Sequence, residues 1–162
     1  MILRALSSIH SLGFTHCDIK PDNVLFFCAK NRGGQSLCEL KIADFGLARE
    51  TSKLSPKSKR FTGTLRYMPS EVAVEGKVSP AMDLWALGCT LVEMLTGNVP
   101  WSRFKEGREE FMEIAAVGTL EIPELVSVQR KDFLRKCFAR DPSQRLHVDM
   151  FLKHPSWKIM VS

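Results

Sequence analysis

Three polar residues lie close together in one short segment of this sequence, namely Asp18, Lys20 and Asn23. Pro21 prevents a regular helix here and favours an extended conformation at Lys20, so the three side chains can converge on one small volume. A carboxylate can accept a hydroxyl proton, an ammonium can hold a phosphate, and an amide oxygen can ligate Mg2+, which prefers oxygen ligands. The segment 16–23 therefore carries side chains suited to phosphoryl transfer.

A second acidic residue follows in the sequence Asp44-Phe45-Gly46. The apolar stretch 40–43 in front of it predicts a strand that delivers the acid to a turn. The pattern H-x-D-x-K-P-x-N followed by D-F-G resembles the catalytic loop and metal-binding turn of eukaryotic protein kinases. Within that family, the loop sequence and D-L-W-A-L-G-C-T-L-V-E-M-L-T-G at 83–97 are most similar to MAP kinase kinase kinases of the plant type.

The resemblance implies a role for each polar residue, with ATP and Mg2+ as cofactors. Asp18 would orient and deprotonate the acceptor hydroxyl, and Lys20 would steady the γ-phosphate of ATP. Asn23 and Asp44 would hold Mg2+. Leu25 would form the floor under the adenine ring. The partners implied are ATP and a protein substrate, for which a MAP kinase kinase is the candidate.

The segment 44–71 is long and rich in Ser, Thr, Lys and Arg, and its position after D-F-G predicts an activation segment. Its end, T-G-T-L-R-Y-M-P-S-E, resembles the family pattern G-T-x-x-Y-M-A-P-E, with Pro69-Ser70 where Ala-Pro is usual. By that match Thr64 would hydrogen-bond Asp18 and Lys20 and mark a serine/threonine enzyme. The alternative is a turn hydroxyl that caps local backbone.

Phosphorylation of this segment is a further expectation. Thr62, between Arg60 and Arg66, is the first candidate phosphosite, and Ser55 is the second. A phosphate there would need cationic partners. Many kinases supply one from the residue before the catalytic Asp, but Cys17 stands at that position. We therefore expect activation to depend less on phosphorylation of the segment.

Several further residues are expected to support the site. Asp83 would accept backbone N–H bonds from the catalytic loop, although an acid near a helix N-terminus can also be favoured by the helix dipole alone. Glu71 would pair with Arg145, the last residue of R-D-P-S-Q-R. The resemblance also assigns structural roles to His16 and Phe45.

The elements around these residues are predicted to be mainly helical. Apolar residues at helical spacing over 2–12, with Gly13 as a stop, indicate a helix that leads into the catalytic loop. Ser79 as N-cap and Gly97 at the far end bound a helix that is apolar on nearly every face and must be buried. Further helices are predicted over 109–117, 127–138 and 148–153. Short strands at 14–15 and 24–27 are expected to form a hairpin that carries the loop.

The predicted fold class is therefore α+β and mainly α-helical. The resemblance implies a protein-kinase-like large (C-terminal) lobe with short β-hairpins that carry the catalytic and metal loops. Residues 1–162 would form a partial kinase domain, because no small-lobe motif appears: neither a glycine-rich loop, nor a strand lysine, nor its glutamate partner. At this length the chain forms one domain.

Composition and charge argue against two classes of binding partner, membranes and nucleic acids. Apolar and charged fractions of 44% and 25% are ordinary for a soluble protein, and no apolar run reaches the roughly 20 residues of a membrane span. The net charge is +5, and the densest basic run, 53–60, lacks interleaved aromatics, so we do not expect direct nucleic-acid binding. Without a signal peptide, a cytoplasmic or nuclear location is expected.

The five cysteines are predicted to be reduced, because their number is odd and no C-x-x-C spacing occurs. Cys28 and Cys38 flank a glycine-rich turn and are the alternative candidates for a disulfide or a metal site.

Three hypotheses follow for function. The first is a serine/threonine protein kinase, which as this chain alone would have little activity and weak ATP affinity because half of the phosphate-binding site is missing. The second is a non-catalytic binding or competitor module that keeps the substrate-docking face. The third, which we favour as the account of the missing motifs, is that Met1 reflects a partial coding sequence and the native protein is longer. Residues that would face a small lobe should then form an exposed apolar patch.

Overall fold

The computed structural model describes residues 1–30, 33–34, 36–53, 63–116, 120–124 and 126–153. The α-helices are α1 (Ile2–Ser11), α2 (Ser70–Glu75), α3 (Ala81–Thr96), α4 (Arg108–Ala116), α5 (Val128–Cys137) and α6 (Val148–Leu152). Short 3-10 helices span Pro21–Asn23, Thr51–Lys53, Leu65–Tyr67 and Pro142–Gln144. The strands are β1 (Phe14–Thr15), β2 (Val24–Lys30), β3 (Ser36–Ile42) and β4 (Arg49–Glu50). The predicted α+β class, mainly helical, is confirmed.

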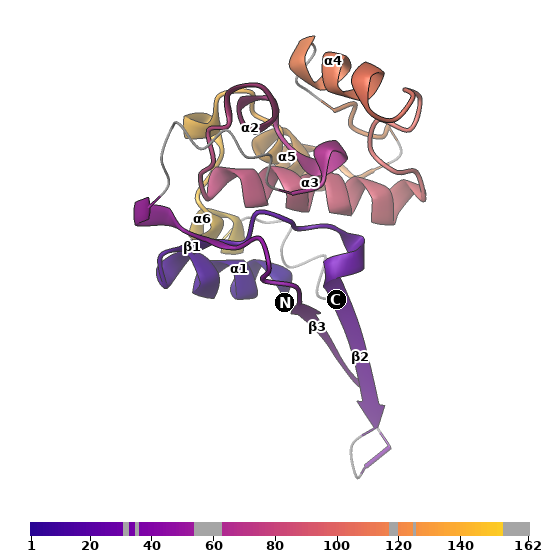
Figure 1. Ribbon diagram of the computed structural model, residues 1–162. Helices are drawn as coiled ribbons and strands as arrows, with labels where there is room; N and C mark the ends of the chain where they lie inside the picture. The colour runs from indigo at the N-terminus through magenta and orange to yellow at the C-terminus, as the bar shows by residue number, and fades with distance from the viewer. Residues whose placement is uncertain (31–32, 35, 54–62, 117–119, 125, 154–162) are drawn as a thin grey trace.

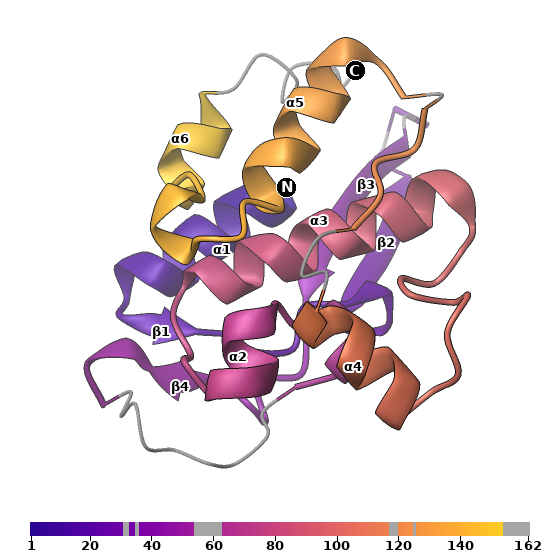
Figure 2. The same cartoon turned by 90° about the horizontal axis from the view of Figure 1, so that it is seen from above.

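The helix α3 runs through the middle of the helical body (Figures 1 and 2). Its residues from Met82 through Thr90 are all buried, as its uniformly apolar sequence predicted. The expected inward stripe of α5 is buried as well, and the ring of Phe138 just beyond α5 meets that of Trp85 edge to face at 5.1 Å. Packing against α3 therefore fixes the position of Asp83 in its first turn.

Close approach of α3 and α5 depends on Gly88. A Cβ atom at this position would lie 2.8 Å from Cβ of Cys137 and 2.8 Å from Cε1 of Phe138. These distances are shorter than real Cβ contacts, so glycine sets the spacing of the two helices.

The strands form two separate two-stranded antiparallel sheets in the described residues, β1 with β4 and β2 with β3. Phe14 pairs with Glu50, and Val24 pairs with Ile42. The expected hairpin between 14–15 and 24–27 is therefore wrong: each strand finds its partner in the segment around Asp44. The segment 16–23 thus connects two sheets, and the strands at its two ends pair with β4 and β3, which flank residues 44–46.

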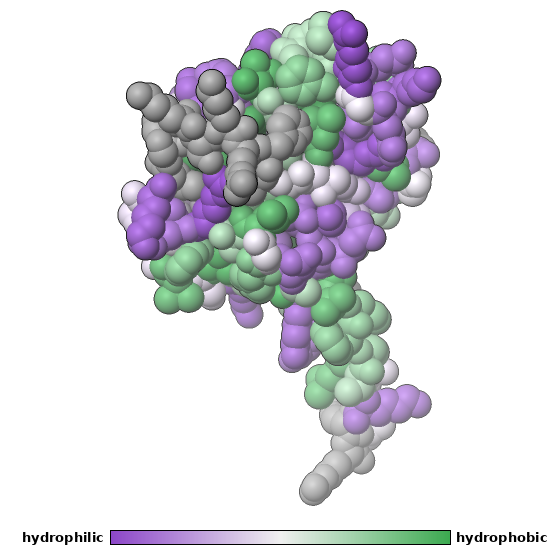
Figure 3. Space-filling view, in the orientation of Figure 1, coloured by the Kyte–Doolittle hydropathy of each residue, from purple (hydrophilic) through white to green (hydrophobic). Residues whose placement is uncertain are grey.

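The β2–β3 hairpin extends away from the helical body (Figure 1). Leu25, Phe26, Phe27 and Leu37 are 42%, 64%, 49% and 60% exposed, and apolar surface runs along the hairpin in Figure 3. A two-stranded sheet alone is marginally stable in water. The exposed apolar patch expected from the sequence is thus present on this hairpin.

Cys28 and Cys38 form a disulfide across the hairpin. The prediction that all five cysteines are reduced is therefore wrong for this pair. The pairing register explains the bond, because Cys28 and Cys38 lie directly opposite each other with their Cα atoms 4.2 Å apart. The other cysteines, Cys17, Cys89 and Cys137, are free and buried.

The helix boundaries agree with the expected ranges within a few residues. α3 ends at Gly97, whose φ of 71° suits glycine at a helix C-terminus. The N-cap of α3 is Pro80 and not the expected Ser79. The carbonyl of Ser79 accepts the Met82 N–H at 3.0 Å. No helix in the described part of the chain combines the length and hydrophobicity of a membrane span.

Candidate functional site

Asp18 lies at the centre of the candidate site and is buried. Its Oδ2 is 2.8 Å from Nζ of Lys20, and its Oδ1 accepts hydrogen bonds from the Thr64 hydroxyl at 2.8 Å and the Thr64 N–H at 3.0 Å. The ammonium of Lys20 also donates to the Thr64 hydroxyl at 2.9 Å. The contacts expected of Thr64 are therefore present, and they join the catalytic loop to a segment 44 residues later.

These contacts determine the protonation of Asp18. Burial by itself raises the pKa of this carboxyl, but the Lys20 ammonium and the hydrogen bonds from Thr64 outweigh burial and hold the pKa below its usual range. The carboxylate is therefore ionised at neutral pH. An ionised, buried acid beside a cation can orient a hydroxyl and accept its proton.

Asn23 and Asp44 are the two residues of the site whose side-chain oxygen atoms could hold a metal ion. The amide nitrogen of Asn23 donates to the carbonyl of Asp18 at 2.8 Å and to Oδ2 of Asp18 at 3.1 Å. Within the described part of the chain, the amide oxygen is then left as an acceptor. The Ala43 N–H donates to the Asn23 carbonyl at 2.9 Å, so Asp44 follows directly after a backbone contact with Asn23.

An amide oxygen and a carboxylate suit Mg2+, which takes few protein ligands and completes its shell with water and phosphate oxygens. The described residues contain no cluster of three or more His, Cys, Asp or Glu side chains, as a dedicated transition-metal site would require. Asp44 has a φ of 61°, a rare conformation for a residue other than glycine, and its Oδ1 accepts the Gly46 N–H at 3.1 Å. The turn thus holds the acid in a defined orientation.

Asp83 braces the catalytic loop from beneath, as expected. Its carboxylate accepts the His16 N–H at 2.8 Å and the Cys17 N–H at 2.9 Å. Asp83 lies in the first turn of α3 and is fully buried, and its two bonds to the loop go beyond what the helix dipole alone would explain.

His10 is a supporting residue that the sequence analysis missed. Its Nε2 is 2.9 Å from Oδ2 of Asp83, and its side chain is 3% exposed. A signal was available, because His10 lies four residues after Leu6 and seven after Leu3, on the buried face of α1. A polar side chain on such a face needs a partner, and here the partner is the carboxylate that holds the catalytic loop.

His16 and Phe45 connect the catalytic loop to the metal-binding turn. Nδ1 of His16 accepts the Asp18 N–H at 3.3 Å, so Nε2 carries the ring proton and donates to the carbonyl of Ala43 at 3.1 Å. The rings of His16 and Phe45 meet edge to face at 4.9 Å, although Phe45 is 52% exposed. His16 therefore links the residues that flank Asp18 and Asp44.

The position before Asp18 is occupied by a neutral, unreactive thiol. Burial, together with the nearby Asp83 carboxylate, raises the pKa of Cys17 to about 12. Cys17 has a φ of 69°, and a Cβ on Gly63 would lie 2.3 Å from its carbonyl oxygen. Glycine at 63 therefore lets the activation segment pack directly on the catalytic loop.

Glu71 and Arg145 form the expected ion pair. Two guanidinium nitrogens of Arg145 donate to the two carboxylate oxygens of Glu71, at 2.5 and 3.0 Å, and both residues are buried. Nε of Arg145 also donates to the carbonyl of Ala139 at 2.8 Å, and its guanidinium lies 5.0 Å from the ring centre of Trp85. The pair fastens the end of the activation segment to the core.

The remaining predicted residues are not brought into this cluster by any described contact. Leu25 lies on β2, directly after the loop, and is partly exposed. Thr62 and Ser55 lie outside the described residues.

Comparison with known proteins places these motifs in a family. The model for the protein kinase domain matches residues 1–157. Mitogen-activated protein kinase kinase kinase 20 of Arabidopsis thaliana is 42% identical over 160 residues, covering 94% of this chain and 44% of that protein. Mitogen-activated protein kinase kinase kinase 5 of Homo sapiens is 38% identical over 165 residues, covering 97% of this chain and 12% of that protein. MAP kinase kinase kinase wis4 of Schizosaccharomyces pombe is 36% identical over 168 residues. The chain spans less than half the length of these relatives.

Proposed function

Because this chain belongs to the protein kinase family, we propose that it forms the large lobe of a serine/threonine kinase that transfers the γ-phosphate of ATP to a protein hydroxyl. The observation that carries the proposal is the convergence of Lys20, Asn23 and Thr64 on the carboxylate of Asp18. Mg2+ and ATP would supply the charge neutralisation and the transferable phosphate.

Each residue of the site has its own role in the proposed phosphoryl transfer. Asp18, ionised because of its cationic and hydroxyl partners, orients the acceptor hydroxyl and takes its proton. Lys20 is half-buried at 21% exposure, so its ammonium can reach both Asp18 and a phosphate oxygen. Asn23 and Asp44 offer oxygen atoms to the metal ion, and Leu25 lies at the start of the strand beside them.

Assignment to the large lobe is supported by the exposed side chains next to this site. Leu25, Phe26, Phe45 and Leu47 are each more than 40% exposed, although they adjoin the catalytic loop and the metal-binding turn. Apolar surface of this kind next to a catalytic centre marks a face that another part of a protein covers. We propose that a small lobe covers it and supplies the remaining contacts to ATP.

The pathway proposal rests on the relatives. The similar proteins from plant, animal and yeast are all named MAP kinase kinase kinases. We propose that the protein acts in a MAP kinase cascade with a MAP kinase kinase as its substrate, and that Thr64 makes it specific for serine and threonine.

Phosphoryl transfer by a chimera tests the proposal. Residues 1–162 are joined behind the part of Arabidopsis thaliana MAP kinase kinase kinase 20 that precedes the matched region, and transfer from γ-labelled ATP to a MAP kinase kinase is measured. We expect label on serine and threonine but not on tyrosine, and a loss of at least about a hundredfold in Asp18→Asn. The matched control Asp132→Asn, on a half-exposed residue of α5, should keep full activity. A folded, ATP-binding chimera that is inactive, or equally active with Asp18→Asn, would contradict the proposal.

A further inference from the structure

The disulfide of the β2–β3 hairpin has no part in the proposed phosphoryl transfer. Cys28 of β2 and Cys38 of β3 are bonded near the outer end of the hairpin, which extends away from the helical body (Figure 1). Both residues are exposed. A small thiol or a small disulfide in solution can therefore approach this pair.

The other three cysteines are protected from the same chemistry. Cys17, Cys89 and Cys137 are free and buried. Burial raises the pKa of Cys89 and of Cys137 well above the usual value for a thiol, as it does for Cys17. The thiolate is the nucleophile in thiol–disulfide exchange, so these buried thiols should react slowly. Exchange is therefore directed to Cys28 and Cys38.

Strand register keeps the two cysteines opposite each other. Cys28 pairs with Cys38, two positions beyond the pair of Phe26 and Leu40, so all four side chains lie on one face of the hairpin. The Cα atoms of the two cysteines are 4.2 Å apart, close to the roughly 4.5 Å of the antiparallel pairs whose side chains approach most closely. Two reduced thiols in this register would remain opposite each other, so the bond can open and form again.

The bond joins the strands at the end of the hairpin that the body of the protein does not support. At the inner end, Ile42 packs against the core and the Ala43 N–H donates to the carbonyl of Asn23 at 2.9 Å. Towards the tip, Phe26 and Leu37 are 64% and 60% exposed. A two-stranded sheet is marginally stable in water, so the outer pairs should open readily without the bond. A covalent link between the strands limits that opening.

We propose that Cys28 and Cys38 form a reversible thiol–disulfide switch, closed by a small disulfide such as oxidised glutathione and opened by a small thiol. The closed state holds the strand register of the hairpin that connects Asn23 with Asp44. This inference goes beyond the proposed phosphoryl transfer and does not depend on it.

Closure of the switch takes place in two exchange steps. The thiolate of one cysteine attacks a sulfur atom of the oxidant, which forms a mixed disulfide and releases one thiolate. The thiolate of the second cysteine then attacks the protein sulfur of the mixed disulfide and releases the second thiolate. The two cysteines lose two electrons and two protons, and the oxidant becomes two thiols.

Controlled oxidation of the whole 162-residue chain tests this chemistry. The chain is reduced with dithiothreitol, freed of the reductant and incubated under native conditions with oxidised glutathione. Remaining thiols are alkylated, and the cysteines are mapped by mass spectrometry. We expect the chain to lose two hydrogen atoms, to carry no glutathione and to yield a linked peptide with Cys28 and Cys38. The buried cysteines should be alkylated only after unfolding.

A shift of one residue in the second cysteine provides a matched control. The variant Cys38→Ser/Leu37→Cys keeps two cysteines on the hairpin at nearly the same spacing. Because successive side chains point to opposite faces, position 37 faces away from Cys28. We expect this variant to accumulate the glutathione adduct and to form the internal disulfide at least about tenfold more slowly than the wild type.

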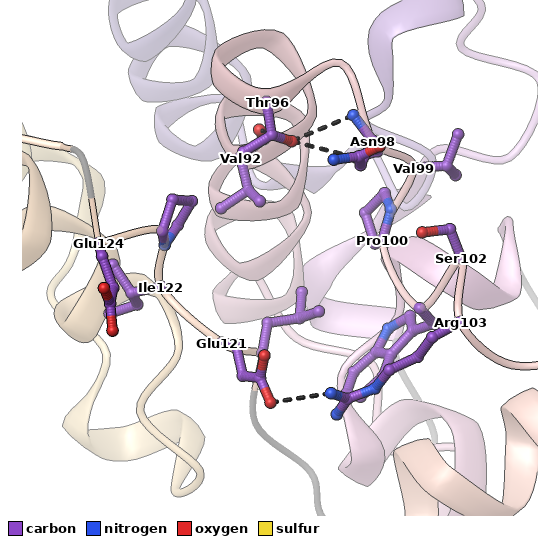
Figure 4. A pocket seen from close by; sticks show the side chains of 13 residues that line it. Val92, Thr96, Asn98, Val99, Pro100, Ser102, Arg103, Glu121, Ile122 and Glu124 are labelled. Carbon is purple, nitrogen blue, oxygen red and sulfur yellow. Dashed lines mark hydrogen bonds and ion pairs between the residues drawn. The ribbon is translucent and has the colours of Figure 1, made fainter.

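Hydrogen exchange measures the effect on the hairpin. We expect the amide of Glu39 to exchange at least about tenfold more slowly in the oxidised chain than in the reduced chain, and Ala43 to change in the same direction. The Asn98 amide is the reference, because it donates to Oγ1 of Thr96 at 3.1 Å beside a groove that no residue of the hairpin lines (Figure 4). Its exchange should be the same in both states. In Cys28→Ser/Cys38→Ser, glutathione should have no effect on exchange.

Several results would overturn the proposal. One is a native chain that gains glutathione without forming the internal disulfide, or whose buried cysteines react as fast as Cys28 and Cys38. Another is equally fast closure in the variant with the shifted cysteine. A third is exchange at Glu39 and Ala43 that does not depend on oxidation, or a change at Asn98 as large as theirs.

Discussion

At the scale of single residues, the site is an arrangement of hydrogen bonds around two buried carboxylates. The carboxylate of Asp18 contacts the Lys20 ammonium and the Thr64 hydroxyl. Asp83 lies behind the loop and accepts two of its backbone N–H groups. One acid is thus available for chemistry while the other maintains the loop conformation.

Removal of the Thr64 hydroxyl should raise the pKa of Asp18. The folded pKa of Asp18 is below its usual value of about 3.9, so the unfolded chain binds more protons as the pH falls. The stabilisation from this group is therefore complete above about pH 4 and is lost as the pH falls through the folded pKa. In Thr64→Val, carbon-13 NMR titration of the Asp18 carboxyl should give a midpoint above that of the wild type. An unchanged or lower midpoint would show that the Thr64 hydroxyl does not stabilise the ionised form of Asp18.

Substitution of Asp83 should destabilise the chain, because the residue is buried and its partners would be left without an acceptor. Asn keeps the size of the side chain but removes its charge and one of its two acceptor oxygens, so a loop N–H or His10 loses its partner. We expect Asp83→Asn to lower the free energy of unfolding by about 1.5–3 kcal/mol, measured by urea denaturation. The control Glu39→Gln, in an exposed pair with Lys41, should cost less than about 1 kcal/mol. Equal effects would argue against the bracing role.

At the scale of elements, two contacts hold the activation segment and the central helix in place. The ion pair of Glu71 and Arg145 ties the first turn of α2 to the segment before α6. Gly88 lets α3 and α5 approach closely, and Asp83 depends on the position of α3. The geometry of the site therefore depends on how the helices pack.

Breaking the buried ion pair between Glu71 and Arg145 should lower the free energy of unfolding. Arg145→Met leaves the carboxylate of Glu71 buried without a partner, so we expect a loss of about 3–5 kcal/mol in the free energy of unfolding. Arg103→Met breaks an exposed pair of similar length with Glu121 and should cost less than about 1 kcal/mol. The double variant Glu71→Gln/Arg145→Met should be less destabilised than the sum of the single variants. Additive effects in that cycle would contradict direct pairing.

Overpacking at Gly88 should destabilise despite the better helix propensity of alanine. The added methyl group would overlap Cys137 and Phe138, so we expect Gly88→Ala to cost about 1–3 kcal/mol. Phe138→Leu in the same chain should recover part of the loss in thermal denaturation, because it makes room for the methyl group. A gain in stability from Gly88→Ala alone would show that the helices can separate without cost.

The sequence predicted the contacts whose residues belong to recognisable motifs, and it failed where spatial pairing decides the outcome. Asp83, Glu71 and Arg145 were identified because each motif has a fixed position in the family pattern. The partner of Phe14 was predicted wrongly, because a two-residue strand carries no pairing signal and its partner lies 36 residues away at Glu50. The bond between Cys28 and Cys38 follows from strand register, which cysteine spacing does not reveal.

At the scale of the whole molecule, the segments 16–23 and 44–46, which we propose bind phosphate and metal, lie beside an exposed apolar face that includes Leu25, Phe26 and Phe45. Phosphoryl transfer depends on positioning and charge stabilisation, so we expect ATP to bind weakly where only one side of the phosphates is contacted.

The 162-residue chain alone should have little kinase activity. We expect no transfer of labelled phosphate to a generic protein substrate and weak ATP binding by calorimetry, because Lys20, Asn23 and Asp44 would contact only one side of the phosphates. Transfer that is abolished by Asp18→Asn would refute this prediction. Binding of kinase-cascade proteins that is insensitive to Asp18→Asn would instead support a non-catalytic binding module.

The most direct test of the account is whether Asn23 and Asp44 hold one metal ion beside Asp18. In this test, Mn2+ takes the place of Mg2+ in the presence of saturating ATP. Because Mn2+ is paramagnetic, it broadens the NMR signals of backbone amides near it, and the broadening is measured for each residue. The account predicts the strongest broadening at residues 23 and 44, and its loss in both Asn23→Ala and Asp44→Ala. Broadening that is absent from these residues, or that persists unchanged in both variants, would contradict a phosphoryl-transfer centre at this site.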